Sequence, residues 1–165
     1  MLSKLMLDEM NEQIKHELYS SYLYLSMSAH CESANLPGFA AWLRVQAQEE
    51  LGHALKFYDH ILDRNEKVTL QAIDQPVIEF KSPKDVFQQV YEHEQKVTAR
   101  IHKLYSLAVD EKDYASQTFL LWFVNEQVEE EKNSSQILDM LEKIGTSVGS
   151  LYQLDHRVGE RGKGE

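Results

Sequence analysis

Glu50 and His53 are three residues apart, and on a helix this spacing places both side chains on one face, one turn from each other. A carboxylate and an imidazole presented in this way can bind the same metal ion. By itself the match is weak, because glutamate and histidine often share this spacing on a solvated helix face. Other residues with ligand-type side chains accompany the pair: Glu17, Glu94, Gln127 and Glu130.

These residues recur at matched intervals along the chain. The interval from Glu17 to Glu50 equals the interval from Glu94 to Gln127. One longer interval relates Glu17 to Glu94, Glu50 to Gln127, His53 to Glu130 and Glu49 to Glu126. The pattern predicts two helix pairs, each with one acid on its first helix and two residues three positions apart on its second. Helical bundles that bind two metal ions through carboxylates have this arrangement.

Length and composition limit the classes of protein to consider. A chain of 165 residues suits a single domain over residues 1–165 with a sizeable core. The formal charge of −10 argues against a nucleic-acid surface and suits a protein that attracts cations. We expect neither a signal peptide nor a membrane span, because no apolar run is long enough. The one cysteine, Cys31, cannot form an intrachain disulfide, which favours the cytoplasm and a buried thiol.

Start and stop signals divide the chain into five helices. Pro37 and Gly38 interrupt the first helical pattern, Ser82 is a suitable N-cap for the third helix, and Gly145 ends the fourth. The expected helices span residues 3–35, 38–64, 83–111, 113–144 and 148–158. The segment after residue 158 is expected to be loose.

Connection lengths predict the topology. The first and third connections are short, so the helices that they join should be antiparallel. The middle connection of about 17 residues can extend to roughly 55–60 Å, whereas a helix of about 27 residues is only about 40 Å long. The expected fold is therefore all-α, a four-helix bundle with one long crossover between helices two and three, plus a short fifth helix.

Apolar residues at helical spacing predict which face of each long helix is buried. The expected core positions, helix by helix, are Met10, Ile14, Ser21 and Leu25; Leu43, Ala47, Ala54, Phe57 and Ile61; Phe87, Val90, Val97, Ile101 and Leu104; and Leu120, Phe123, Ile137, Leu141 and Ile144. The ligand-type residues fall on the same faces, where unpaired carboxylates cost several kcal/mol each and no Lys or Arg compensates them. A cation would compensate them; the alternative is that some of these side chains reach water.

The donor set indicates which metal would bind. Carboxylates with one imidazole are mostly hard oxygen ligands, which suit iron or manganese better than structural zinc. Glu50 lies centrally and could bridge two ions. The two expected sites consist of Glu17, Glu50 and His53, and of Glu50, Glu94 and Glu130. Gln127 is expected as a hydrogen-bonding neighbour, and Tyr24 either as a hydrogen-bonding or oxidisable group or as a core tyrosine.

The motifs of the chain also resemble those of a known family. They are Asn11–Gln13, Glu17–Ser20, Ala47–Glu50 with His53-Ala54, Tyr91–Glu94 and Phe123–Glu131. The sequence resembles the ferritins, most closely the non-haem ferritins of bacteria and archaea. This resemblance implies a cytoplasmic cage of 24 identical subunits that oxidises Fe²⁺ with O₂ or peroxide and stores a ferric oxide mineral. It also implies ferroxidase residues at Glu17, Tyr24, Glu50, His53, Glu94, Gln127 and Glu130.

A second set of acids lies beside the first. Glu49 and Glu126 each precede a first-site position by one residue, which turns them by about 100° to a neighbouring face. Glu129 is three residues after Glu126 and shares its face. They form either a solvated acidic surface or, as the resemblance implies, a third iron site completed by Glu130.

Departures from related groups are also informative. A bacterioferritin would carry a second Glu-x-x-His where Gln127 and Glu130 stand, and a haem-ligating methionine at Leu51, so no haem is expected. The acidic pair of the three-fold channel in animal ferritins would align near Gln117 and Leu120, which leaves the route of iron entry open.

Assembly and alternative functions complete the expectations. The apolar residues of helix one cannot all face one core: Tyr19, Tyr22, Leu23, Tyr24, Leu25 and Met27. A second face is therefore expected against another subunit, unless these are ordinary surface aromatics. The alternative function is a non-enzymatic, iron-binding cage subunit. A peroxide-scavenging di-iron enzyme usually carries a Cys-rich iron domain, which a single cysteine excludes.

Overall fold

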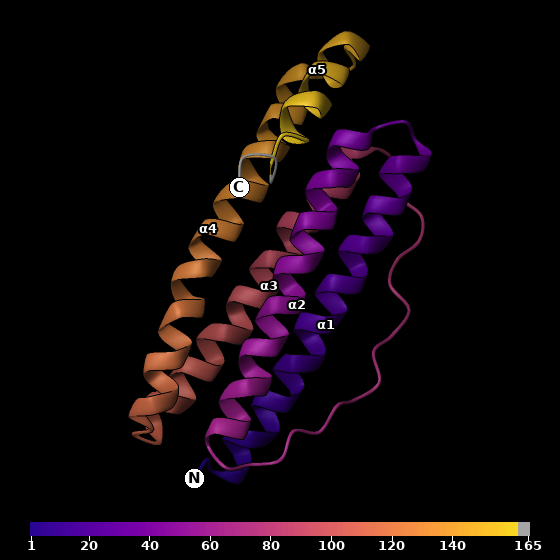
Figure 1. Ribbon diagram of the computed structural model, residues 1–165. Helices are drawn as coiled ribbons and strands as arrows, with labels where there is room; N and C mark the ends of the chain where they lie inside the picture. The colour runs from indigo at the N-terminus through magenta and orange to yellow at the C-terminus, as the bar shows by residue number, and fades with distance from the viewer. Residues whose placement is uncertain (162–165) are drawn as a thin grey trace.

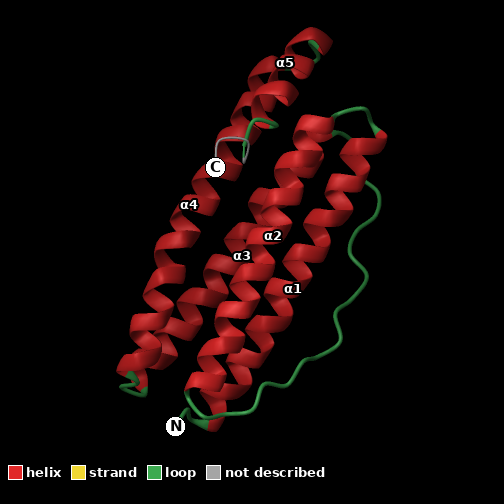
Figure 2. Ribbon diagram, viewed as in Figure 1, coloured by secondary structure: helices red, strands yellow, loops and turns green. Residues whose placement is uncertain are grey.

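The computed structural model describes residues 1–161, which form five helices and no strand (Figure 2). The helices are α1 (Lys4–Ser33), α2 (Pro37–Asp63), α3 (Pro83–Asp110), α4 (Tyr114–Ile144) and α5 (Val148–Val158). The four long helices lie side by side, and α5 folds back beside the end of α4 (Figure 1). The predicted all-α bundle with a short fifth helix is confirmed. The expectation of a loose tail falls largely on residues 162–165, which lie outside the described residues.

Short polar side chains begin four of the five helices. Each oxygen accepts a hydrogen bond from a backbone N–H of the first turn, which would otherwise lack a partner. The caps are Ser3 for Met6, Ser82 for Asp85, Asp113 for Ser116 and Ser147 for Ser150. These local contacts explain why the helix starts can be recognised in the sequence.

The start of α2 is capped from a distance. Leu36 precedes this helix and offers no capping oxygen. The carboxylate of Asp155 in α5 instead accepts from the backbone N–H of Gly38 at 3.0 Å and of Phe39 at 2.8 Å. A negative charge is favourable at the positive end of a helix dipole. The buried Asp155 therefore fastens α5 to the first turn of α2.

Gly38 makes this close approach possible. A Cβ added at Gly38 would lie 1.8 Å from the backbone oxygen of Asp155, whereas one added at Gly52, in the same helix, would meet nothing within 4 Å. We expect Gly38→Ala to displace α5 and destabilise the fold by about 1–3 kcal/mol. Gly52→Ala should instead stabilise it by about 0.5–1 kcal/mol, because alanine is the better helix former. Thermal unfolding of the two variants measures both effects; equal melting temperatures would contradict the proposed docking.

The crossover, residues 64–82, runs along the outer side of α1 from one end of the bundle to the other (Figure 1). Two hydrogen bonds hold it there. The backbone N–H of Thr69 donates to Asn11 Oδ1 at 2.7 Å, and the Ser26 hydroxyl donates to the carbonyl of Val77 at 2.6 Å. Because the loop covers the length of the bundle, α2 and α3 run in the same direction, as the loop length predicted.

The core consists of two apolar clusters with a polar layer between them. One cluster, toward α5, includes Tyr24, Phe39, Phe87 and Leu141. The other, toward the α3–α4 turn, includes Met10, Phe57, Ile101 and Leu120. Within residues 1–161, none of the helices is both long enough and apolar enough to cross a membrane.

One part of the predicted core face of α1 is wrong. Leu25 is 47% exposed and Ser21 is only partly buried, whereas Tyr24, Met27 and Cys31 are buried. The prediction advanced by two steps of four residues beyond Glu17. Each such step turns about 40° past a full turn, and two of them rotate Leu25 out of the core.

Candidate metal centre

Each of the four long helices contributes a side chain to the polar layer. Glu17 comes from α1, Glu50 and His53 from α2, Glu94 from α3, and Gln127 and Glu130 from α4. Every one of them is between 1% and 4% exposed. Buried charges at such a depth require partners, so the contacts of each group determine what the layer can bind.

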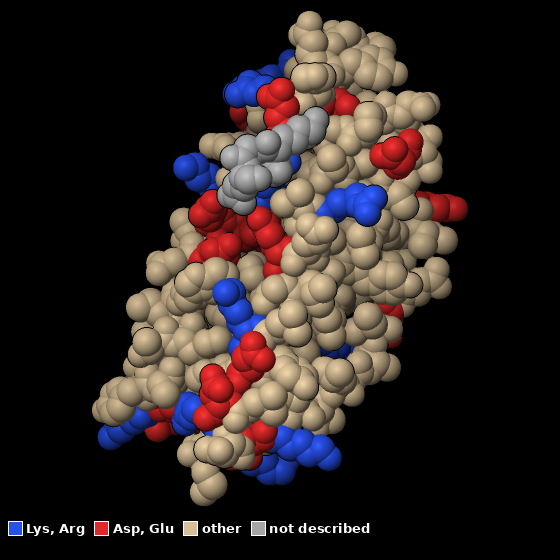
Figure 3. Space-filling view, in the orientation of Figure 1, with Lys and Arg blue, Asp and Glu red and all other residues tan. Residues whose placement is uncertain are grey.

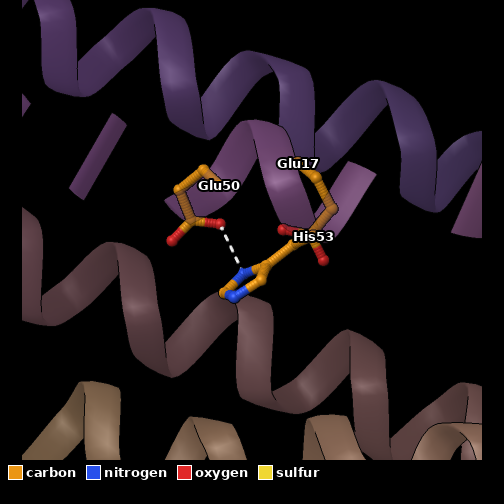
Figure 4. Close-up of side chains that lie close together, drawn as sticks. All are labelled: Glu17, Glu50 and His53. Atoms are coloured by element: carbon orange, nitrogen blue, oxygen red, sulfur yellow. Dashed lines mark hydrogen bonds and ion pairs between the residues drawn. The ribbon is translucent and has the colours of Figure 1, made fainter. Parts of the chain in front are cut away.

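Glu17, Glu50 and His53 form the first group of converging ligands. One ligand atom from each lies within 4.8 Å of the others, and the three side chains point into the same space between the helices (Figure 4). His53 Nδ1 is 3.2 Å from Glu50 Oε2, and Gln13 donates to Glu17 Oε1 at 2.8 Å. The second oxygen, Glu17 Oε2, is the one buried side-chain polar atom of residues 1–161 that has no hydrogen-bond partner.

His53 also belongs to a second group, with Glu126 and Glu130. Its Nε2 faces Glu126 Oε1 at 3.9 Å, on the ring edge opposite to Glu50. The imidazole therefore lies between two carboxylate groups and could bind an ion through either nitrogen. Glu50 stays the ligand that the sequence predicts to be shared by two ions.

Glu50, Glu94 and Glu130 form the predicted second site. Among residues 1–161 they do not form a group whose ligand atoms all lie within 4.8 Å of one another, as Glu17, Glu50 and His53 do. Short hydrogen bonds hold two of the three carboxylates, and Glu50 Oε1 accepts a longer one from Gln46 at 3.4 Å. Tyr24 donates its hydroxyl to Glu94 Oε1, and Gln127 Nε2 donates to Glu94 Oε2 at 3.1 Å. Gln46 Nε2 donates to Glu130 Oε2 at 2.6 Å. Carboxylates that accept hydrogen bonds in this way are turned toward their donors.

Tyr24 is fixed from two sides. Its ring meets the imidazole of His93 edge to face, with the centroids 5.8 Å apart, and its hydroxyl bonds to Glu94. His93 Nε2 lies 2.7 Å from the Ser20 hydroxyl. Burial lowers the pKa of His93 to about 4, so this imidazole is neutral at physiological pH and packs as an apolar group.

Burial without a neighbouring cation raises the pKa values of the carboxyl groups in the layer. For Glu17 the pKa lies well above its usual value, through burial and then through the charge of Glu50. The pKa of Glu50 is raised by burial and by the charges of Glu94 and Glu130. The pKa of Glu130 rises to about 8, through burial and the charge of Glu94. A metal ion that binds here must displace protons from these groups.

The outer acids are less enclosed than the inner layer. Figure 3 shows a gathering of acidic side chains between α2 and α4. Glu49 and Glu126 are partly buried, and Glu129 is exposed. Burial raises the pKa of Glu126; the imidazole of His53 lowers it, and the charges of Glu129 and Glu49 raise it. Glu49 also forms an ion pair: its Oε2 lies 2.6 Å from Arg161 Nη2.

Three contributors to the layer were not identified from the sequence. Gln13 and Gln46 each precede a glutamate by four residues, a spacing at which side chains on a helix meet, so this signal was available. Arg161 carried no local signal, because it reaches the layer only through the docking of α5.

The ferritin family model, described as a ferritin-like domain, matches residues 7–144. The chain belongs to the ferritin family. The matched range contains α2, α3, α4 and all of α1 except its first three residues, and every glutamate and histidine of the two ligand groups.

Individual ferritins resemble the chain over nearly its whole length. The bacterial non-heme ferritin of Staphylococcus haemolyticus is 40% identical over 161 residues, which is 98% of this chain and 97% of that protein. The one from Escherichia coli O6:H1 is also 40% identical, over 96% of each chain. An open pore ferritin from the hyperthermophilic archaeon Archaeoglobus fulgidus has 45% identity and a TM-score of 0.97, with 98% of this chain and 99% of that chain covered. The predicted resemblance to the ferritins of bacteria and archaea is confirmed.

Proposed function

We propose that this ferritin chain stores iron and oxidises Fe²⁺ to Fe³⁺ in the polar layer at the middle of the bundle. The observation that carries the proposal is the unpartnered oxygen of Glu17, beside the carboxylate of Glu50 and the imidazole of His53. A buried oxygen without a donor is costly, and a cation would satisfy it. Carboxylates with one imidazole form the hard donor set that suits iron.

Two Fe²⁺ ions are the substrates in this proposal. Glu17, Glu50 and His53 would bind the first, and Glu50, Glu94 and Glu130 the second, with Glu50 shared between them. Each Fe²⁺ loses one electron, and O₂ takes up both electrons with two protons to give hydrogen peroxide. If peroxide is the oxidant, the same two electrons and two protons reduce it to two waters. The protons that leave the carboxyl groups when iron binds are available close to the oxidant.

Tyr24 and Gln127 have a supporting role in this arrangement. Both donate to Glu94 and so fix the direction of a carboxylate that would bind the second ion. Residues that orient a ligand commonly change metal affinity or activity ten- to a hundred-fold when they are removed. Tyr24 is also close enough to the layer to be oxidised itself.

Aerobic oxidation of Fe²⁺ by the purified protein tests the proposal. The formation of Fe³⁺ is followed by its absorbance, with two Fe²⁺ added per chain and the uncatalysed rate subtracted. A rapid phase that uses two Fe²⁺ per chain supports the ferroxidase function. Binding of Fe²⁺ without accelerated oxidation would favour the non-enzymatic cage subunit instead.

We further propose that the chain assembles into a cage of 24 subunits in a reducing compartment such as the cytoplasm. Apolar side chains are exposed on α1 and on the crossover beside it, including Tyr22 at 46%, Leu25 at 47% and Ile78 at 61%. Apolar surface of this kind is usually buried in an interface. Mass photometry of the purified protein gives the number of subunits, and a particle of one or two chains at micromolar concentration would contradict the cage.

The outer acids are proposed as a third iron site, formed by Glu49, Glu126, Glu129 and Glu130. We expect weaker binding there than in the inner layer, because these ligands are less buried and stay better hydrated. An iron-soaked crystal of the parent should show three peaks of anomalous scattering. The double variant Glu126→Ala with Glu129→Ala should lose only the third peak and change the amount of iron oxidised per O₂. Loss of all three peaks, or only two peaks in the parent at saturating iron, would refute the third site.

A further inference from the structure

Arg161 lies at the edge of the metal layer, although the sequence places it near the end of the chain. Its Nη2 is 2.6 Å from Glu49 Oε2, and its Nη1 donates to Gln46 Oε1 at 2.8 Å. The guanidinium carbon is 4.6 Å from the centre of the Trp42 ring, so the group also rests on an aromatic face. Three contacts on α2 therefore hold this one cation.

Gln46 connects Arg161 to the inner carboxylates. Its side chain is fully buried. The amide oxygen accepts from Arg161, while the amide nitrogen donates to Glu130 at 2.6 Å and lies 3.4 Å from Glu50 Oε1. A cation on the oxygen side and carboxylates on the nitrogen side allow only one orientation of the amide. Arg161 thus fixes the amide orientation in which Gln46 donates to Glu130.

The position of Arg161 depends on the docking of α5. Asp155 is fastened to the first turn of α2 by two hydrogen bonds, and Gly159 packs directly on Gly38. Arg161 follows two residues later, in the turn that ends α5. The docking of α5 therefore places the Arg161 cation beside Glu49.

We propose that Arg161 is an internal counter-ion for the outer acids, and that it must leave Glu49 before a metal cation can bind there. This inference rests on the proposed metal function of the outer acids. Arg161 and a metal ion compete for Glu49, because both are attracted to the same carboxylate charge. Release of Arg161 would also free the Gln46 amide to turn, and with it Glu130, which is shared by the inner layer and the outer site.

Zinc titration tests the competition without any oxidation step. Zn²⁺ is redox-inert, and isothermal titration calorimetry of the assembled full chain at low ionic strength resolves strong and weak sites. In Arg161→Gln the weakest Zn²⁺ site should tighten roughly five-fold, the scale of a partly exposed ion pair. Arg161→Lys keeps the charge, but an ammonium group lacks the planar guanidinium that contacts Glu49 and Gln46 together. The affinity of its weakest Zn²⁺ site should therefore lie between those of the parent and of Arg161→Gln.

Arg157 provides the matched control. It is an exposed cation of the same helix and forms no ion pair among residues 1–161, so Arg157→Gln changes the net charge equally but should leave the weakest site near its parental affinity. In a Glu49→Gln background, Arg161→Gln should have a smaller effect, because only the contact through Gln46 to Glu130 is then lost. Equal constants for Arg161→Gln and Arg157→Gln would overturn the inference while leaving strong inner sites intact. Absence of strong sites in the parent would instead count against the proposed function.

Discussion

Replacing Glu50 with alanine should slow aerobic Fe²⁺ oxidation by about 100-fold or more and leave the assembled particle intact. Glu50 is the carboxylate that both proposed iron positions share, and it is also the contact that orients His53, at 3.2 Å. Its removal therefore disturbs both ions at once. Removing a buried carboxyl group with a raised pKa does not remove apolar packing, so the fold should persist.

Asp59→Ala is a suitable control for this prediction, because Asp59 is an exposed acid on the same helix. It should oxidise Fe²⁺ at the parental rate. Oxidation rate and particle mass are measured on the same samples. An assembled Glu50→Ala particle with an undiminished rapid phase would rule out Glu50 as the shared ligand.

The metal-free protein should lose stability as the pH rises from about 4.5 toward 8. The pKa of Glu130 is raised from 4.5 to about 8 by burial and by Glu94. Between these values the folded state holds a proton that the unfolded state has released, so the free energy of unfolding falls with increasing pH. The protonated carboxyl group of Glu130 contributes its full stabilisation below pH 4.5, and this contribution is lost by about pH 8. The change from this group is of the order of a few kcal/mol.

Glu130→Gln should reduce this dependence, with a remainder from Glu17 and Glu50, and raise the melting temperature near pH 8. Glutamine is neutral at every pH, and its carbonyl can still accept the hydrogen bond from Gln46. Thermal unfolding of chelator-treated protein at pH 5, 6, 7 and 8 measures the slope, with the exposed Glu92→Gln as a variant that should keep it. Added iron should reverse the trend, because the ion binds the deprotonated groups. A pH-independent parent would show that Glu130 is compensated in the fold.

The helices and the inner ligands could be predicted from the sequence because both depend on local spacing. Ser82, Asp113 and Gly145 act within one turn of the chain, so their effect is visible in a short window. Glu17, Glu50 and His53 converge because each lies on the apolar face of its own helix, and packing those faces together leaves little freedom in where the side chains meet. The crossover was predictable because its length has to match that of the bundle.

Tertiary structure decided the finer arrangement of the site. Which face of α1 is buried beyond Glu17 depends on the accumulated rotation of the helix, and this placed Tyr24 in the layer and Leu25 at the surface. His53 lies between two groups of acids. The donors Tyr24, Gln127 and Gln46 come from three different helices and hold Glu94 and Glu130.

The sequence by itself predicted the all-α bundle, its connections and the convergence of Glu17, Glu50 and His53, because helical periodicity and capping are properties of neighbouring residues. Only the folded chain brought Asp155 to the start of α2 and Arg161 to Glu49. These contacts join residues more than a hundred positions apart. Their geometry depends on the angle at which α5 docks, and no short-range pattern in the sequence encodes that angle.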